Sequence, residues 1–320
     1  MKKLLFAVFT AFVFFAVPVG AASARVFLSI ATGSTGGTYY PLGGGIAEII
    51  SKNVPEFQVT SETGNASAAN LNLIGTRQIE MAFAQNDIAY WASKGMPPFK
   101  ERYENIRVVA SLYPEHVHGI TLKGSGVNDI TDIRGKRVSV GAPGSGVLGD
   151  VSAILKIAEL HYGDMSPDFL DFNNTTQRFK DGQLDVGFVV AGYPTSSIID
   201  LAATNDIDLI SFNDDFMTRL TEEYPYFIKD VIPAGTYRGI DSDIVTPAVM
   251  AMLVCEASLS DDVVYRFTKA LWENIADLHK VHPKAGLITL VTALDGVSVP
   301  VHPGAARFYT ERGMTVPKVK

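Results

Sequence analysis

From residue 25 onward, short apolar runs alternate with segments whose apolar residues recur at helical spacing. Each short run predicts a strand and each helical segment a helix. The first series predicts strands at 25–31, 57–63 and 79–85, a helix that carries Leu42, Ile46, Ile49 and Ile50, a helix over 66–75, and a short helix near Asp87. Such alternation is typical of an α/β fold.

A second series with the same order begins at Lys136. It predicts strands at 137–141, 169–172 and 184–190, a helix bearing Val147, Val151, Ile154, Leu155 and Ala158, and a helix over 175–180. The run 79–84 resembles the run 184–189, and Gly33-Ser34 occupies the place of Gly144-Ser145. We therefore expect two similar lobes.

The segments outside the two series indicate how the lobes are joined. Residues 106–123 form a long β-rich stretch that we expect to cross from one lobe to the other. Beyond Pro233 the pattern gives one strand at 245–255 and a long helix at 261–282, so the chain is expected to cross back. The predicted division is 25–118 with 230–320 as the first lobe and 119–229 as the second. Two connections form a hinge, which favours a ligand cleft that closes.

The first 24 residues have the pattern of a secretory signal peptide. Two lysines precede the apolar run 4–17, and Ala22-Ser23-Ala24 is a small-residue cleavage site. We expect cleavage after Ala24 and a periplasmic protein. An uncleaved anchor helix is the alternative, although the run is shorter than the ~20 residues that a bilayer requires. Cys255, the single cysteine, has no partner within the chain and is expected to be a buried apolar residue.

Composition and charge exclude several functional classes. The 320 residues are 47% apolar and 19% charged, which is typical of a globular protein. Lys and Arg number 27 against 34 Asp and Glu, so nucleic-acid binding is not expected. The chain has no Gly-x-Ser-x-Gly and no His-Glu-x-x-His motif. Two glycine-rich segments, residues 33–37 and 141–146, do not end in the Gly-Lys-Ser/Thr of a P-loop. We expect no cofactor, no metal and no enzymatic activity. An exported hydrolase using Ser34 or Ser145 is the competing hypothesis.

Glycine- and hydroxyl-rich loops follow the predicted strands of both lobes. Ligands of open α/β sheets bind where strands end and helices begin. Helix N-termini there expose N–H groups and partial positive charge, which predicts an anion site between the lobes. Asp87 is expected to cap its own helix, and Pro194 to begin one. The predicted ligand-binding residues are Ser34, Thr35, Gly36, Gly37, Thr38, Tyr39, Asn65, Gln85, Ser145, Gly146, Gly192 and Tyr193.

Five motifs give the chain a resemblance to a known family. They are Gly33-Ser-Thr-Gly-Gly-Thr-Tyr-Tyr-Pro-Leu-Gly43, Thr63-Gly-Asn-Ala-Ser67, Met81-Ala-Phe-Ala-Gln-Asn-Asp87, Ile133-Arg-Gly-Lys-Arg-Val-Ser-Val-Gly141 and Gly182-Gln-Leu-Asp185. Together they resemble the TAXI family, the extracytoplasmic solute receptors of TRAP transporters. The resemblance runs from about Arg25 to Ala305, nearly the whole chain after the leader.

The resemblance implies a two-lobed periplasmic binding protein fold of type II-like form, with two hinge crossings. It also implies a monomer that delivers a small carboxylate, such as glutamate or 2-oxoglutarate, to TRAP membrane subunits, which are fused in some systems. None of the predicted cleft loops contains arginine, which agrees with anion capture by backbone N–H groups. A signalling receptor and a surface adhesin remain alternatives.

Overall fold

The computed structural model describes residues 25–319. The predicted signal peptide, residues 1–24, lies outside the described residues. Within these residues, ten strands join into one continuous sheet. They are β1 (Val26–Ala31), β2 (Phe57–Glu62), β3 (Met81–Gln85), β4 (Ile106–Leu122), β5 (Arg137–Ser139), β6 (Ser166–Asp168), β7 (Val186–Ala191), β8 (Ile207–Leu209), β9 (Ile228–Ile232) and β10 (Ile244–Glu256).

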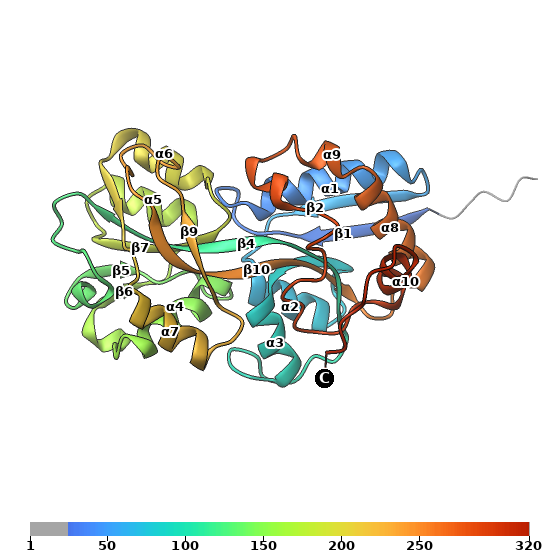
Figure 1. The fold of residues 1–320 in the computed structure, drawn as a ribbon, viewed down its shortest axis with the longest axis horizontal. Coiled ribbons are helices and arrows are strands. Elements are labelled where there is room, and N and C mark those ends of the chain that lie inside the picture. The colour runs from blue at the N-terminus through green and yellow to red at the C-terminus, as the bar shows by residue number, and fades with distance from the viewer. Residues whose placement is uncertain (1–24, 320) are drawn as a thin grey trace, which may run out of the picture.

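Helices cover both ends of this sheet (Figure 1). The α-helices are α1 (Tyr39–Asn53), α2 (Ser67–Gly75), α3 (Asn86–Lys94), α4 (Gly146–Ile157), α5 (Phe172–Lys180), α6 (Ser196–Thr204), α7 (Asp214–Glu223), α8 (Asp261–Glu273), α9 (Ile275–Leu278) and α10 (Pro303–Glu311). Short 3-10 helices are η1 (Ile130–Ile133), η2 (Tyr162–Asp164) and η3 (Pro283–Leu287). No helix within residues 25–319 has the length and apolar character needed to cross a membrane.

The strand order shows how the two lobes are built. It runs β2-β1-β3-β10-β4-β7-β5-β6, with β8 beside β4 and β9 beside β10. The parallel set β2-β1-β3 lies in the first lobe, and the parallel set β6-β5-β7 repeats that order in the second. The two long antiparallel strands β4 and β10 run between the lobes (Figure 1). The expected two similar lobes and two crossings are therefore confirmed.

Each lobe has its own buried core. One core is built from residues between 28 and 113 and between 251 and 309, and includes Phe83 and Leu253. The other includes Ile154 and Phe188 and is built from residues between 117 and 249. Ile232, Tyr237, Ile240, Ile244 and Val249 pack in this second core. We therefore place the return crossing within β10, later than residue 230.

Four local predictions were wrong. The segment 169–172 is not a strand, because β6 ends at Asp168 and Asp171 caps α5. The long helix predicted at 261–282 ends at Glu273, with Asn274 between α8 and the short α9.

Pro194 does not begin a helix, since Thr195 is the N-cap of α6. Nor is Asp87 the cap of α3, where Gln85 holds the N-cap position.

Candidate functional site

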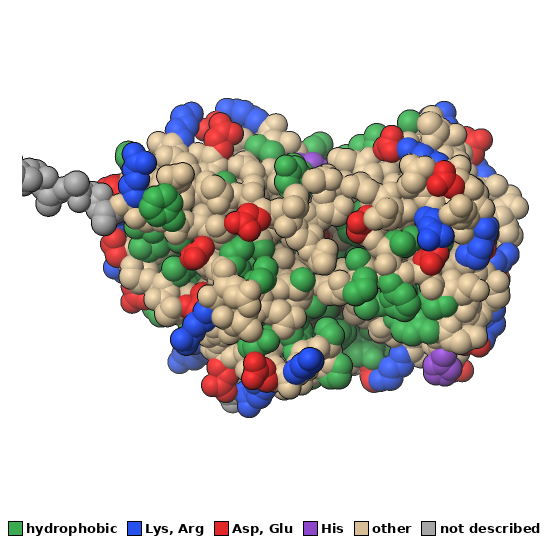
Figure 2. Space-filling model, turned by 180° about the vertical axis from the view of Figure 1, so that it is seen from behind, with side chains coloured by type: hydrophobic (Ala, Val, Ile, Leu, Met, Phe, Trp, Pro, Cys, Tyr) green, Lys and Arg blue, Asp and Glu red, His purple; other side chains and the backbone are tan. Residues whose placement is uncertain are grey.

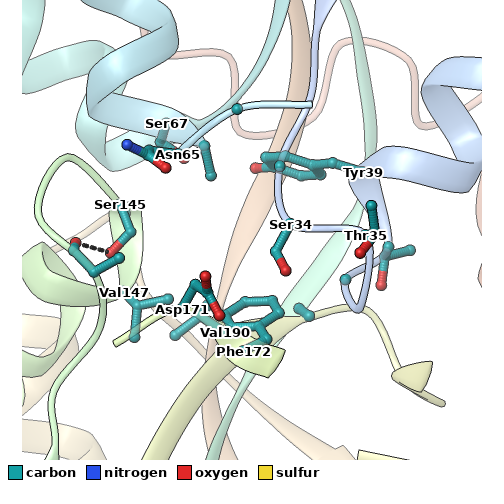
Figure 3. Close-up of a pocket in the computed structure, with 18 of the residues that line it drawn as sticks. Ser34, Thr35, Tyr39, Asn65, Ser67, Ser145, Val147, Asp171, Phe172 and Val190 are labelled. Carbon is teal, nitrogen blue, oxygen red and sulfur yellow. Dashed lines mark hydrogen bonds between the residues drawn. The ribbon is translucent and has the colours of Figure 1, made fainter. Parts of the chain in front are cut away.

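A cavity of about 400 Å³ lies between the two lobes. Most of the residues that line it are glycines or carry hydroxyl or amide side chains, and among the described residues that line it there is no Lys, Arg or His. Figure 3 shows Asn65, Ser67 and Tyr39 on one side and Ser145 and Asp171 on the other. The lining residues are Gly33, Ser34, Thr35, Gly37, Thr38, Tyr39, Thr63, Gly64, Asn65, Ala66, Ser67, Gln85 and Glu115 of the first lobe, and Ala142, Ser145, Gly146, Val147, Leu170, Asp171, Phe172, Asn173, Val190 and Ala191 of the second.

Nine of the twelve residues predicted from the sequence line this cavity: Ser34, Thr35, Gly37, Thr38, Tyr39, Asn65, Gln85, Ser145 and Gly146. Gly36, Gly192 and Tyr193 lie outside the lining. Gly36 contacts the second lobe instead, because the Ser197 N–H donates a hydrogen bond to the Gly36 carbonyl oxygen at 3.1 Å. Gly192 accepts one from the Thr38 hydroxyl at 2.9 Å. The ligand-binding role of all twelve stays a prediction.

Four helices, two from each lobe, begin at the cavity. The N-cap residues Thr38 of α1, Ala66 of α2, Ser145 of α4 and Asp171 of α5 all line it. Neither α1 nor α2 receives a side-chain cap. Each helix N-terminus carries a partial positive charge and N–H groups that favour an anion. The backbone therefore contributes positive potential to the cavity, which the carboxyl of Asp171 at the α5 N-cap opposes, and no basic side chain contributes to the described lining.

Glycines allow the two lobes to approach each other closely. A Cβ at Gly37 would lie 2.9 Å from the Phe172 ring of the second lobe, and one at Gly146 would overlap the Gln85 side chain of the first. A Cβ at Gly36 would overlap Asn173. All three glycines are among the predicted ligand-binding residues. In the structure, the absence of a side chain at each of them lets the opposite lobe approach the backbone.

Hydrogen bonds between the lobes surround the cavity, so the structure is a closed arrangement. On one side the Ala69 N–H donates to the Gly144 carbonyl oxygen at 2.9 Å, and on the other the Asn173 amide donates to the Thr35 hydroxyl at 3.1 Å. Trp91 Nε1 donates to Tyr226 Oη at 3.0 Å at the outer edge of α3. These contacts hold the lobes together around the cavity, and the surface is indented between the lobes (Figure 2). Their separation would widen the entrance to the cavity.

Glu115 of β4 is a lining residue that the sequence analysis missed. It is buried, and the Tyr39 hydroxyl donates a hydrogen bond to its Oε2 at 2.6 Å. Burial raises the pKa of Glu115 to about 8, although the bond from Tyr39 and the charge of Lys284 act in the opposite direction. Burial thus favours the protonated form of the carboxyl, which can donate as well as accept hydrogen bonds. A single Glu within an otherwise buried strand was the available signal.

The region behind the cavity is a packed polar cluster at the hinge. Lys284 of η3 is buried with its Nζ 3.7 Å from the centroid of the Tyr193 ring, and burial lowers the pKa of Lys284 to about 8. His116 Nε2 and Asp230 Oδ2 lie 2.9 Å apart. A Cβ on Gly192 would meet Lys284 and Tyr113. Gly192 and Tyr193 are therefore packed into the hinge.

The histidines at positions 118, 279 and 282 have structural partners. His118 Nε2 lies 2.9 Å from Tyr237 Oη, and burial lowers the pKa of His118 to about 3. His279 Nε2 hydrogen-bonds the Ile288 carbonyl oxygen, and His282 Nδ1 accepts from the Lys284 N–H. Within residues 25–319 no three His, Cys, Asp or Glu side chains are grouped to hold a metal ion.

Two α/β lobes joined by two crossing strands, with a cavity between them, define the fold of the periplasmic solute-binding proteins, in a type II-like form. Two solved structures illustrate the likeness. The binding protein component of an ABC phosphonate transporter from Pseudomonas aeruginosa superposes with a TM-score of 0.53 at 11% identity, covering 83% of this chain and 80% of that one. The ligand-binding component of an ABC-type import system from Staphylococcus aureus, with zinc bound, gives 0.52 at 11% identity, covering 92% and 94%.

Sequence comparison gives the family. Residues 30–313 match the NMT1-like family, and the chain belongs to it. This match spans both lobes, both crossing strands and every residue that lines the cavity.

Proposed function

We propose that the protein is an exported receptor that captures a small organic anion, such as glutamate or 2-oxoglutarate, and delivers it to TRAP membrane subunits. The convergence of four helix N-termini on one cavity carries the proposal. Both lobes contribute, so a ligand in the cavity contacts them together only when they are closed, and such a ligand favours closure. The volume of about 400 Å³ is near the lower end of ligand pockets, which suits a small solute.

The TRAP partner rests on the sequence motifs, whereas the two structural relatives are components of ABC-type systems. An ABC permease is therefore the second candidate partner. Reconstitution of the mature chain with each class of permease in vesicles, with uptake of labelled solute as the readout, separates the two. Uptake with an ABC permease and none with a TRAP permease would contradict the proposed partner.

A hydrolase is less compatible with the site. The Ser145 hydroxyl donates to the Ala142 carbonyl oxygen at 2.7 Å and accepts from the Leu148 N–H at 3.3 Å, so it caps α4 (Figure 3). No histidine is among the described residues that line the cavity with Ser34 and Ser145. The protein is proposed to act by binding alone.

A thermal-shift screen of residues 25–320 against amino, keto and dicarboxylic acids, followed by calorimetry, tests the ligand class. A ligand at about 100 times its dissociation constant adds ~2.7 kcal/mol to the free energy of unfolding. We expect a shift with L-glutamate or 2-oxoglutarate and none with the corresponding uncharged amides or alcohols. A shift with the neutral analogues alone would overturn the anion assignment.

A further inference from the structure

Two aspartates from opposite lobes meet beside the cavity. Asp87 lies in the first turn of α3 in the first lobe, and Asp150 in α4 of the second, and both are fully buried. Their carboxyls hydrogen-bond to each other, and the Gln85 amide donates to Asp150 Oδ2 at 2.8 Å. Gln85 itself is held by Ser67, whose hydroxyl accepts from the Gln85 N–H at 3.1 Å. This arrangement exists only when the lobes are together.

The pair has few donors from the rest of the protein besides the Gln85 amide. Oδ1 of Asp150 has no further partner among the described residues, and Asp87 lies at the start of α3, where the backbone N–H groups of Asp87 and Ile88 act on its carboxyl. Two ionised carboxylates are acceptors only and repel each other, so a bond between them requires a proton on one of them. Burial raises the pKa of both carboxyls, and for Asp150 the nearby charge of Asp87 raises it further.

The ionisable side chains that act on the pair are acidic, although Asp87 lies at the N-terminus of α3, which carries partial positive charge. Glu115 of β4 acts on Asp150 through its negative charge. Tyr226, between α7 and β9, interacts with both aspartates. Within residues 25–319 no basic side chain is among the groups that shift either carboxyl, and Lys284 acts on Glu115 instead.

We propose that Asp87 and Asp150 make closure of the lobes proton-dependent, with the pair taking up one proton from solvent when the lobes close. In the open form each carboxyl is hydrated and titrates near the usual aspartate value of about 4. Between that value and the raised pKa of the closed pair, closing binds a proton. The equilibrium constant for closing therefore falls by up to tenfold for each unit of rising pH in that window. The association constant of the ligand should fall with pH in the same proportion, a statement that rests on the proposed function.

The first test uses pH alone, without ligand. Spin labels on Cys introduced at the exposed positions Lys52 of α1 and Gln177 of α5 report the distance between the lobes. The native Cys255 is buried and is not expected to react. We expect a larger closed population at about pH 5.5 than at about pH 8.5 in otherwise wild-type protein. The same distance distribution at both values would overturn the proposal.

Variants separate the pair from other titrating groups. Asp150→Asn supplies an amide donor in place of the proton, so we expect its distance distribution to stay closed and independent of pH; Asp87→Asn is the second variant if that protein does not fold. Asp241→Asn, an exposed aspartate, is the matched control and should keep the wild-type pH dependence. Asn variants that retain the wild-type dependence would refute the assignment.

The second test uses L-glutamate and 2-oxoglutarate as probes. Calorimetry in buffers of different ionisation enthalpy should show uptake of up to one proton per ligand in the wild type near neutral pH and almost none in Asp150→Asn. Binding without proton uptake in the wild type would contradict the proposal. If neither acid binds at any pH, the proposed ligand class fails, while the label experiment still decides the role of the pair.

Discussion

Replacement of Gly146 by alanine should impair closing of the lobes without lowering the stability of the folded chain. Gly146 is the first residue of α4, and its φ is not in the left-handed region, so alanine suits the local backbone and is favoured there by about 0.5–1 kcal/mol. In the closed arrangement, however, the new methyl group would overlap Gln85 Oε1 and lie 2.9 Å from Ser67 Oγ. The clash therefore arises only where the two lobes meet, and neither lobe is disturbed when they are apart.

The size of the effect follows from what Gln85 must give up. If Gln85 moves aside, its 2.8 Å hydrogen bond to the buried Asp150 is lost. A hydrogen bond between neutral groups contributes about 0.5–1.5 kcal/mol. This corresponds to an affinity weakened roughly 2- to 12-fold, since each 1.4 kcal/mol is a factor of ten. If the lobes stay apart instead, the loss is larger.

Calorimetry with the acid that binds the wild type measures this loss. Thermal unfolding without ligand should be unchanged or slightly more stable, because the methyl group finds space in the open form. Gly163→Ala is the matched control in the same lobe, since a Cβ there meets nothing within 4 Å. An affinity for Gly146→Ala equal to that of the wild type would refute the closed contact between α4 and Gln85.

Three further predictions concern the cavity and the core. Gly37→Val should weaken ligand binding because its side chain would meet the Phe172 ring of the opposite lobe, and calorimetry showing unchanged affinity would remove that loop from closure. The pKa of Glu115 is raised from 4.5 to about 8, so the folded protein binds more protons than the unfolded chain in that window, and stability should fall as pH rises through it; urea unfolding of Glu115→Gln should lose this slope. Cys255→Ser should lower the free energy of unfolding by about 1–3 kcal/mol, because the hydroxyl enters an apolar core, and urea unfolding with no change would contradict that burial cost.

Periodicity in the sequence predicted most elements, because strands buried on both faces are continuous apolar runs. The prediction failed where an apolar residue is exposed or where a strand is polar. Phe169 is exposed rather than buried in a strand, and β6 is a short polar segment, Ser166-Pro-Asp. In the predicted long helix, Asn274 separates α8 from α9, and no periodic signal marks that break.

The glycine loops of the site were predictable, but the carboxyls were not. Ser34 and Ser145 lie in motifs at the ends of strands, where α/β folds place ligands. Asp87 and Asp150 meet only because the two lobes close, and their pairing leaves no trace in local sequence. Glu115 lies in a strand whose other residues are mostly buried, and its position at the cavity follows from where β4 crosses between the lobes.

The pairing of β4 with β10 has a consequence for the modular construction of such proteins. The second lobe leaves the first along β4 and returns along β10, and His116 of one strand faces Ala248 of the other. The two junctions of the inserted lobe are therefore neighbours in one antiparallel ladder. An entire lobe can be exchanged with that of a relative by matching a single pair of strands, which makes chimaeras with a foreign half-site a practical route to altered selectivity.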